Sequence, residues 1–172
     1  MSYILAIITG LCILGLDQYT KFFIISNFEL AQSHPFIKGL IDITYIHNRG
    51  GAWGMLTGHT WLLLSVTIVV MLICVSLIIR FGIKNRLMFW AIILILSGGL
   101  GNMIDRIFRA GNVVDFLHFE FFPEFPVFNV ADCSIVIGAF LLILYFVIDI
   151  IRDNRQKRSL AGGKDVYEDE NG

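Results

Sequence analysis

Two aspartates in the second half of the chain, Asp115 and Asp132, have surroundings that suit acid–base chemistry. Val113, Val114 and Phe116 flank the first, small or apolar residues flank the second, and neither has a lysine or arginine within three positions. Two carboxyls that face each other in such surroundings share a proton, because two close negative charges repel. One can then act as general base and the other as general acid, with no metal required. The spacing leaves a plainer alternative equally open, in which Asp132 is a helix N-cap and Asp115 a solvated loop acid.

Two further acids lie in apolar stretches of the chain. Asp17 and Lys21 are one helical turn apart, so they can pair as i,i+4 neighbours. This spacing is compatible with a structural ion pair and equally with contact to a substrate. Asp105 directly precedes Arg106, whose guanidinium would keep the carboxyl ionised, and this favours a supporting role. An ionised side chain at the centre of a bilayer costs roughly 2.5–3.5 kcal/mol, so such residues usually have a partner or a function.

The composition indicates that membrane helices position these acids. Of the 172 residues 56% are hydrophobic and 16% are charged, and the mean hydropathy is +0.75. A soluble chain of this length could not bury so much apolar surface in one core. Apolar runs predict four membrane spans, at about 2–25, 60–80, 87–105 and 131–151. We expect the first span to be retained, since it has neither a basic leader nor a small-x-small cleavage site.

The distribution of basic residues predicts the orientation. Arg80, Lys84 and Arg86 lie between spans two and three, and further basic residues follow span four. The positive-inside rule assigns both regions, and therefore both termini, to the cytoplasm. The connections 26–59 and 106–130 then face outward. At 1.5 Å per residue Asp17 lies about 22 Å from the inner end of its span, so we expect all four acids at one level near the outer interface.

We expect one domain, residues 1–152, followed by a charged cytoplasmic tail at 153–172 that is poor in apolar residues and disordered. Alternating side chains over residues 41–47 predict a short strand in the first outer connection. The net charge of −1 argues against a nucleic-acid partner. The cysteines and histidines show neither CxxC nor HExxH spacing, so no metal and no other cofactor is predicted.

Five sequence blocks resemble those of one family, lipoprotein signal peptidase, which is also called signal peptidase II. In chain order they are Asp17-Gln18-Tyr19-Thr20-Lys21, Asn48-Arg49-Gly50-Gly51-Ala52-Trp53-Gly54, Gly98-Gly99-Leu100-Gly101-Asn102-Met103-Ile104-Asp105-Arg106, Gly111-Asn112-Val113-Val114-Asp115-Phe116 and Phe128-Asn129-Val130-Ala131-Asp132. Gly51 stands where the family usually has alanine. Each block alone is weak evidence, but five in this order and on this topology are highly specific.

The resemblance implies a fold and a reaction. The fold is that of an all-α membrane protein, with four transmembrane helices, a small outer β-cradle at about 28–58, and a short outer helix or loop. The reaction is cleavage of bacterial prolipoproteins before their diacylglyceryl-modified cysteine, by an aspartic endopeptidase of the cytoplasmic (inner) membrane. The expected partners are lipid-modified prolipoprotein substrates and membrane lipid, with no nucleic acid and no cofactor, and the chain is expected to be monomeric.

The resemblance also implies roles for particular residues. Asp115 and Asp132 become the catalytic pair. Together with the pairing noted above, it assigns substrate-binding or supporting roles to Asp17, Lys21, Asn48, Asn102, Asp105, Arg106 and Asn129. Six phenylalanines between Phe116 and Phe128 predict an interfacial segment, which could cover the acyl chains of a substrate or only anchor the protein in the bilayer.

Two other classes of protein fit parts of the pattern. A small ion- or proton-coupled transporter would also carry intramembrane acids. Transporter sites usually lie near the middle of the membrane, however, whereas these acids are predicted at one interface. A serine protease is disfavoured because no G-x-S-x-G sequence occurs. A chaperone or assembly factor would not need paired acids.

Overall fold

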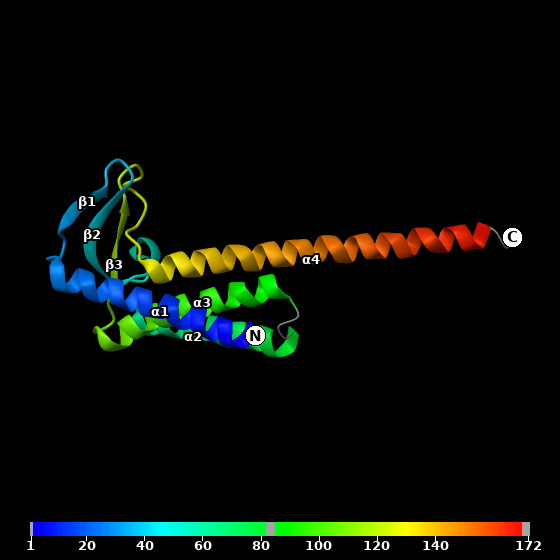
Figure 1. The fold of residues 1–172 in the computed structure, drawn as a ribbon, viewed down its shortest axis with the longest axis horizontal. Helices are drawn as coiled ribbons and strands as arrows, with labels where there is room; N and C mark the ends of the chain where they lie inside the picture. The colour runs from blue at the N-terminus through cyan, green and yellow to red at the C-terminus, as the bar shows by residue number, and fades with distance from the viewer. Residues whose placement is uncertain (1, 82–84, 170–172) are drawn as a thin grey trace.

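The computed structural model describes residues 2–81 and 85–169. Within these ranges the helices are α1 (Ser2–Asn27), α2 (Thr60–Phe81), α3 (Arg86–Phe108) and α4 (Val130–Asp169), and the strands are β1 (Ser33–Ile37), β2 (Ile41–Asn48) and β3 (Val113–Phe119) (Figure 1). Ala52–Gly54 forms a short 3-10 turn. The described helices long and apolar enough to cross a membrane are four, over Ile4–Asn27, Thr60–Phe81, Arg86–Phe108 and Val130–Lys157. The predicted fold class, four spans with a small sheet, is confirmed.

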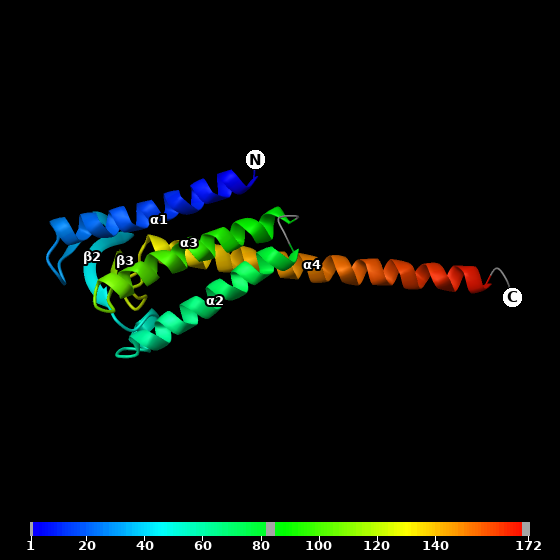
Figure 2. The ribbon, with the colours of Figure 1, turned by 90° about the horizontal axis from the view of Figure 1, so that it is seen from below.

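α3 is the central helix of the bundle. α1 and α2 lie on opposite sides of it, and α4 packs along it (Figures 1 and 2). Glycines on α3 allow this close packing, since small residues let helix backbones approach in lipid. A Cβ built on Gly98 would clash with the backbone oxygen of Ala131 on α4, and one built on Gly101 would clash with the Asp17 carboxylate on α1. Both glycines lie at the end of α3 that carries Asp105.

A three-stranded antiparallel sheet, in the order β1-β2-β3, covers this end of the bundle (Figure 1). The register of β2 on β3 sets Ile46 opposite Asp115, beyond a β-bulge that follows Ile43. The sequence predicted β structure only within 28–58, and β3 adds residues 113–119 to it. The first four residues of β3 are buried, so this strand lacks the polar–apolar alternation of a half-buried strand.

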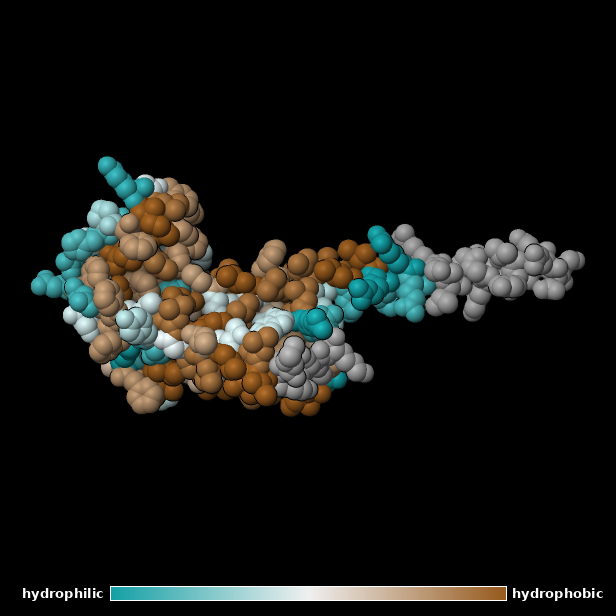
Figure 3. Space-filling view, viewed as in Figure 1, coloured by the Kyte–Doolittle hydropathy of each residue, from teal (hydrophilic) through white to brown (hydrophobic). Residues whose placement is uncertain are grey.

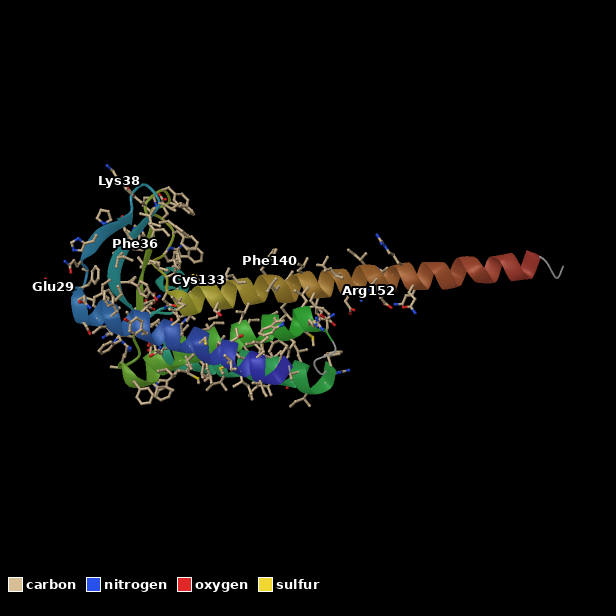
Figure 4. All side chains as sticks on the ribbon, in the orientation of Figure 1. Glu29, Phe36, Lys38, Cys133, Phe140 and Arg152 are labelled. Carbon is tan, nitrogen blue, oxygen red and sulfur yellow. The ribbon has the colours of Figure 1, made fainter. Side chains whose placement is uncertain are left out.

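On the face shown in Figure 3, an apolar belt runs along the helices and separates two polar ends. Large apolar side chains on α1, α2 and α4 are exposed, as expected for helices that face lipid. Glu29 and Lys38 lie at the end that carries the sheet (Figure 4). Phe140 lies further along α4, and Arg152 lies beyond it, away from the sheet (Figure 4). The sheet and Arg152 are thus on opposite sides of the apolar belt.

α4 continues past the end of its predicted span. The charged tail predicted at 153–172 begins within this helix, which extends as far as Asp169. No proline interrupts this segment, and Asp153 pairs with Lys157 one turn later at 2.8 Å. Charge pairs of this spacing support an exposed helix, so the composition that indicated disorder is also compatible with a helical extension.

Candidate active site

Asp132 lies in the first turn of α4, where it forms a capping box with Asn129. The Asn129 side-chain oxygen accepts a hydrogen bond from Asp132 N at 2.9 Å, and Asp132 Oδ2 accepts one from Asn129 N at 3.1 Å. Asn129 is therefore the N-cap, the place that the plainer alternative gave to Asp132. The second oxygen, Asp132 Oδ1, accepts a hydrogen bond from Asn102 Nδ2 on α3 at 2.7 Å. Both oxygens of Asp132 are thus held by a donor.

Asp115 points from β3 into the interior and is only 1% exposed. Its Oδ2 accepts a hydrogen bond from Asn48 Nδ2 on β2 at 2.8 Å, and its Oδ1 accepts one from Asn129 Nδ2 at 2.6 Å. Burial and, second, the negative charge of Asp132 raise the pKa of Asp115 to about 7. Asp115 is therefore not a solvated loop acid, and its carboxyl lies within the field of Asp132.

Asn129 joins the two aspartates. Its backbone N–H donates to Asp132, while its side-chain nitrogen donates to Asp115 and has longer contacts with Asn102 Oδ1 at 3.1 Å and Val114 O at 3.3 Å. Asn129 is completely buried. Because one residue both caps α4 and contacts β3, the start of the helix sets the position of one acid relative to the other.

A second polar cluster lies next to this pair, around Lys21 on α1. The buried ammonium contacts Asp17 Oδ2 at 2.9 Å and Asp105 Oδ2 at 3.0 Å, and it donates to Asn102 Oδ1 at 3.0 Å. The contact with Asp17 is the pair that the i,i+4 spacing predicted. Asn102 connects the two clusters, since its oxygen faces Lys21 and its nitrogen faces Asp132.

Asp105 and Arg106 form no ion pair among the described residues, although the charge of Asp105 acts on Arg106. Asp105 pairs with Lys21 and, at 3.3 Å, with Arg109 one turn later. Adjacent residues of an α-helix point roughly 100° apart, so neighbours in sequence are poorly placed to pair. Arg106 instead donates through Nη1 to Asn102 O at 3.4 Å and feels the charge of Asp132 most strongly among the nearby acids. Its Nε is buried and has no partner among the described residues.

A cavity of about 250 Å³ opens beside Asp132. Asp132, Asn102 and Arg106 form its polar part. The remaining lining residues come from α2, α3 and α4 and are mostly apolar: Val66, Thr67, Val70, Met71, Ile95, Gly99 and Ile135. A space with apolar walls and a few polar groups suits an apolar ligand that carries a polar reacting group.

All nine site residues singled out from the sequence lie in one of the two clusters. The first cluster consists of the acid pair, Asp115 and Asp132, with Asn48, Asn102, Asn129 and Arg106 around it. The neighbouring cluster consists of Asp17, Lys21 and Asp105. Two residues were missed. Gln18 donates to Asp17 at 3.0 Å and to Asp105 at 3.2 Å, and Arg109 pairs with Asp105. The i,i+4 spacing that identified Lys21 would also have identified Arg109.

Four apolar spans with a buried polar site at one end define a multi-pass membrane protein. The chain belongs to the signal peptidase II family. The family model, described as signal peptidase (SPase) II, matches residues 9–148. The protein is accordingly a membrane peptidase, and the resemblance found in the five sequence blocks is confirmed.

Individual relatives and solved structures agree with this assignment. A protein of Anoxybacillus flavithermus named lipoprotein signal peptidase is 39% identical over 170 residues, which cover 98% of this chain and 96% of that protein. One of Bacillus pumilus with the same name is 42% identical over 135 residues, or 78% and 86% of the two chains. Two solved structures of a bacterial membrane enzyme match with TM-scores of 0.78 and 0.76, each at 34% identity. They cover 86% and 84% of this chain and 90% and 93% of their own.

Proposed function

We propose that this peptidase removes signal peptides from diacylglyceryl-modified bacterial prolipoproteins, cutting before the lipidated cysteine, with Asp115 and Asp132 as its catalytic pair. One observation carries the aspartic mechanism: Asn129 donates to Asp132 through its backbone and to Asp115 through its side chain, so two buried carboxyls converge on one residue. The substrate class rests on the names of the relatives, which are lipoprotein signal peptidases.

The two carboxyls start the reaction in different protonation states. Asp115, with a pKa raised to about 7, keeps its proton up to neutral pH and serves as the acid. Asp132 lines the cavity and serves as the base. Asp132 takes a proton from a water molecule, whose oxygen attacks the scissile carbonyl carbon. Asp115 gives its proton to the carbonyl oxygen, so the tetrahedral intermediate forms without a full negative charge.

Collapse of the intermediate returns both protons. Asp132 gives the proton that it took from water to the leaving nitrogen, and the carbon–nitrogen bond breaks. Asp115 takes a proton back from a hydroxyl of the intermediate, which becomes the new carboxyl terminus of the signal peptide. The pair ends as it began, with Asp115 protonated and Asp132 ionised. Asn48 and Asn102, which donate to one oxygen of each acid, keep the carboxyls oriented throughout.

The cavity supports the choice of a lipid-modified substrate. Its walls are mostly apolar and can accept the acyl chains or the signal-peptide helix. Asp132, Asn102 and Arg106 then meet the polar part of the substrate, and the unpaired Nε of Arg106 offers a donor to a carbonyl oxygen. The phenylalanine-rich segment before α4, with Trp53 against Phe125, lies at the same end and offers an apolar cover.

We further propose that the enzyme lies in the cytoplasmic membrane, with both termini inside and the site near the outer face. The basic residues support this, because Arg80 lies in the last turn of α2, away from the sheet, and Arg152 lies on α4 beyond Phe140, also away from the sheet. The peptidase domain is assigned to residues 1–152. We also propose that the enzyme acts as a monomer within membrane lipid.

The proposed function is tested with purified protein and two forms of one preprolipoprotein, with and without the diacylglyceryl group. The lipidated form should be cleaved, and mass spectrometry should find the modified cysteine at the new N-terminus. Asp132→Asn should be inactive, whereas Asp42→Asn, on β2 outside both clusters, should be active. Equal cleavage of the unlipidated form, or a cut elsewhere, would contradict the proposed substrate.

A further inference from the structure

Each carboxylate of the Lys21 cluster holds the backbone one residue before a member of the acid pair. Asp17 Oδ1 accepts a hydrogen bond from Ala131 N at 2.9 Å, and Ala131 directly precedes Asp132. Asp105 Oδ2 accepts one from Val114 N at 3.1 Å, and Val114 directly precedes Asp115. Two carboxylates on different helices thus hold the two chain segments that carry the acids.

Lys21 is the group that joins these two carboxylates. Its side chain is completely buried, and its three N–H hydrogens have three acceptors, Asp17 Oδ2, Asp105 Oδ2 and Asn102 Oδ1, all at 2.9–3.0 Å. Gln18 Nε2 also donates to both carboxylates. Without the cation, two buried negative charges would repel, and their distance would no longer be set.

The contact with Asn102 gives Lys21 a second effect on the pair. An amide side chain presents an oxygen on one side and a nitrogen on the other. Because Lys21 can only donate, it attracts the oxygen of Asn102 and leaves the nitrogen pointing at Asp132, where it donates at 2.7 Å. The cation on α1 therefore also selects which end of the amide meets the acid on α4.

We propose that Lys21 is a positioning residue for the reaction: with Asp17 and Asp105 it sets the separation of the Asp115 and Asp132 backbones, and through Asn102 it orients the Asp132 carboxyl. This inference rests on the proposed catalytic pair. Lys21 does not line the cavity, so it acts through other residues and not on the substrate. A role in stability alone would explain the cluster less well, because a buried ion pair can often be replaced by apolar residues at little cost.

The test compares kcat, KM and the pH dependence of kcat for folded variants acting on a lipidated preprolipoprotein. Lys21→Met keeps the length of the side chain and removes the charge. The double variant Asp17→Asn/Lys21→Met also removes one of the two carboxylates that Lys21 joins. The asparagine it introduces still offers an oxygen to Ala131 N–H, while Asp105 keeps Arg109. Lys157→Met is the matched control, since it removes an exposed i,i+4 pair with Asp153.

We expect kcat of the folded Lys21→Met enzyme to fall by roughly 10- to 100-fold, as for a misplaced catalytic group, with KM changed less than about twofold. The charged groups that act on Asp132, the base whose ionisation sets the acidic limb, are Lys21, Asp17, Asp115 and Arg106. Loss of Lys21 removes a positive charge, so the acidic limb of the pH profile should move to higher pH. The double variant should show the same loss of kcat, and Lys157→Met should match the wild type.

Three results would overturn the positioning role. One is a wild-type kcat and pH profile in folded Lys21 variants, and another is a loss of activity that only follows the folded fraction. The third is failure of both variants to fold, which would make the cluster a requirement for folding and not for positioning. The proposed catalytic pair is tested separately, by cleavage with the wild-type enzyme and loss of cleavage in Asp132→Asn.

Discussion

Replacing Asp115 by asparagine should make the folded protein more stable at alkaline pH. The pKa of Asp115 is raised in the fold from its ordinary value of 3.8 to about 7. Between these values the folded state holds a proton that the unfolded state has released, so stability falls as the pH rises through this window. The loss is complete above pH 7, where the wild type must keep a carboxylate buried. Asparagine removes the ionisation and with it this cost.

The size of the effect follows from two opposing terms. The change from 3.8 to about 7 corresponds to about 4 kcal/mol in favour of asparagine above pH 7, at about 1.4 kcal/mol for each pKa unit. Asparagine offers one oxygen where aspartate offers two, so Asn48 or Asn129 loses an acceptor, which costs about 1–3 kcal/mol. The net gain is about 2 kcal/mol, or a rise in Tm of roughly 4–8 °C for a chain of this size.

Thermal unfolding of detergent-purified protein at pH 5 and pH 8 measures this difference. Asp115→Asn should have the higher Tm at pH 8, and the advantage should disappear or reverse at pH 5, where the wild-type carboxyl is protonated in the fold. Asp153→Asn, which alters an exposed acid, is the control and should show no such pH dependence. A Tm difference of the same size at both pH values would refute the assigned ionisation of Asp115.

Two further predictions concern packing and orientation. Gly98→Ala should lower stability by about 1–3 kcal/mol in thermal unfolding, because its methyl group would meet the backbone of Ala131, whereas Gly15→Ala, with open space around it, should be neutral or stabilising. Reporter fusions after Gly58 and after Arg155 should report the outside and the cytoplasm respectively. A destabilised Gly15→Ala with a normal Gly98→Ala, or a cytoplasmic Gly58 fusion, would contradict these predictions.

The spans and the level of the acids could be predicted because they depend on local properties of the chain. Apolar runs of membrane-spanning length located four helices, and the rise per residue brought Asp17 and Asp105 to the same end. The pairing of Asp17 with Lys21 follows from the helical period alone. The spacing of Asp115 and Asp132 alone did not decide between a catalytic pair and structural roles. The order of the motif blocks favoured the catalytic pair.

The features that escaped prediction depend on contacts between distant segments. β3 is buried by β2 and the helices, so its sequence lacks the alternation of an exposed strand. The capping role of Asn129 could be read from its place before α4, but its contact with Asp115 requires the sheet to be in place. The ion-pair partner of Asp105 was not predicted, because Lys21 reaches it from another helix.

The central claim, that Asp115 and Asp132 activate one water molecule as a unit, is tested most directly by the turnover of a lipidated preprolipoprotein by Asn variants whose folding has been verified. Asp115→Asn and Asp132→Asn should each abolish turnover, and the double variant should be scarcely worse than either, because residues that act as a unit are not additive. Folded Asp105→Asn should keep partial activity. Substantial turnover by folded Asp115→Asn, with none by folded Asp105→Asn, would mean that Asp132 works with the end of α3 and not with β3.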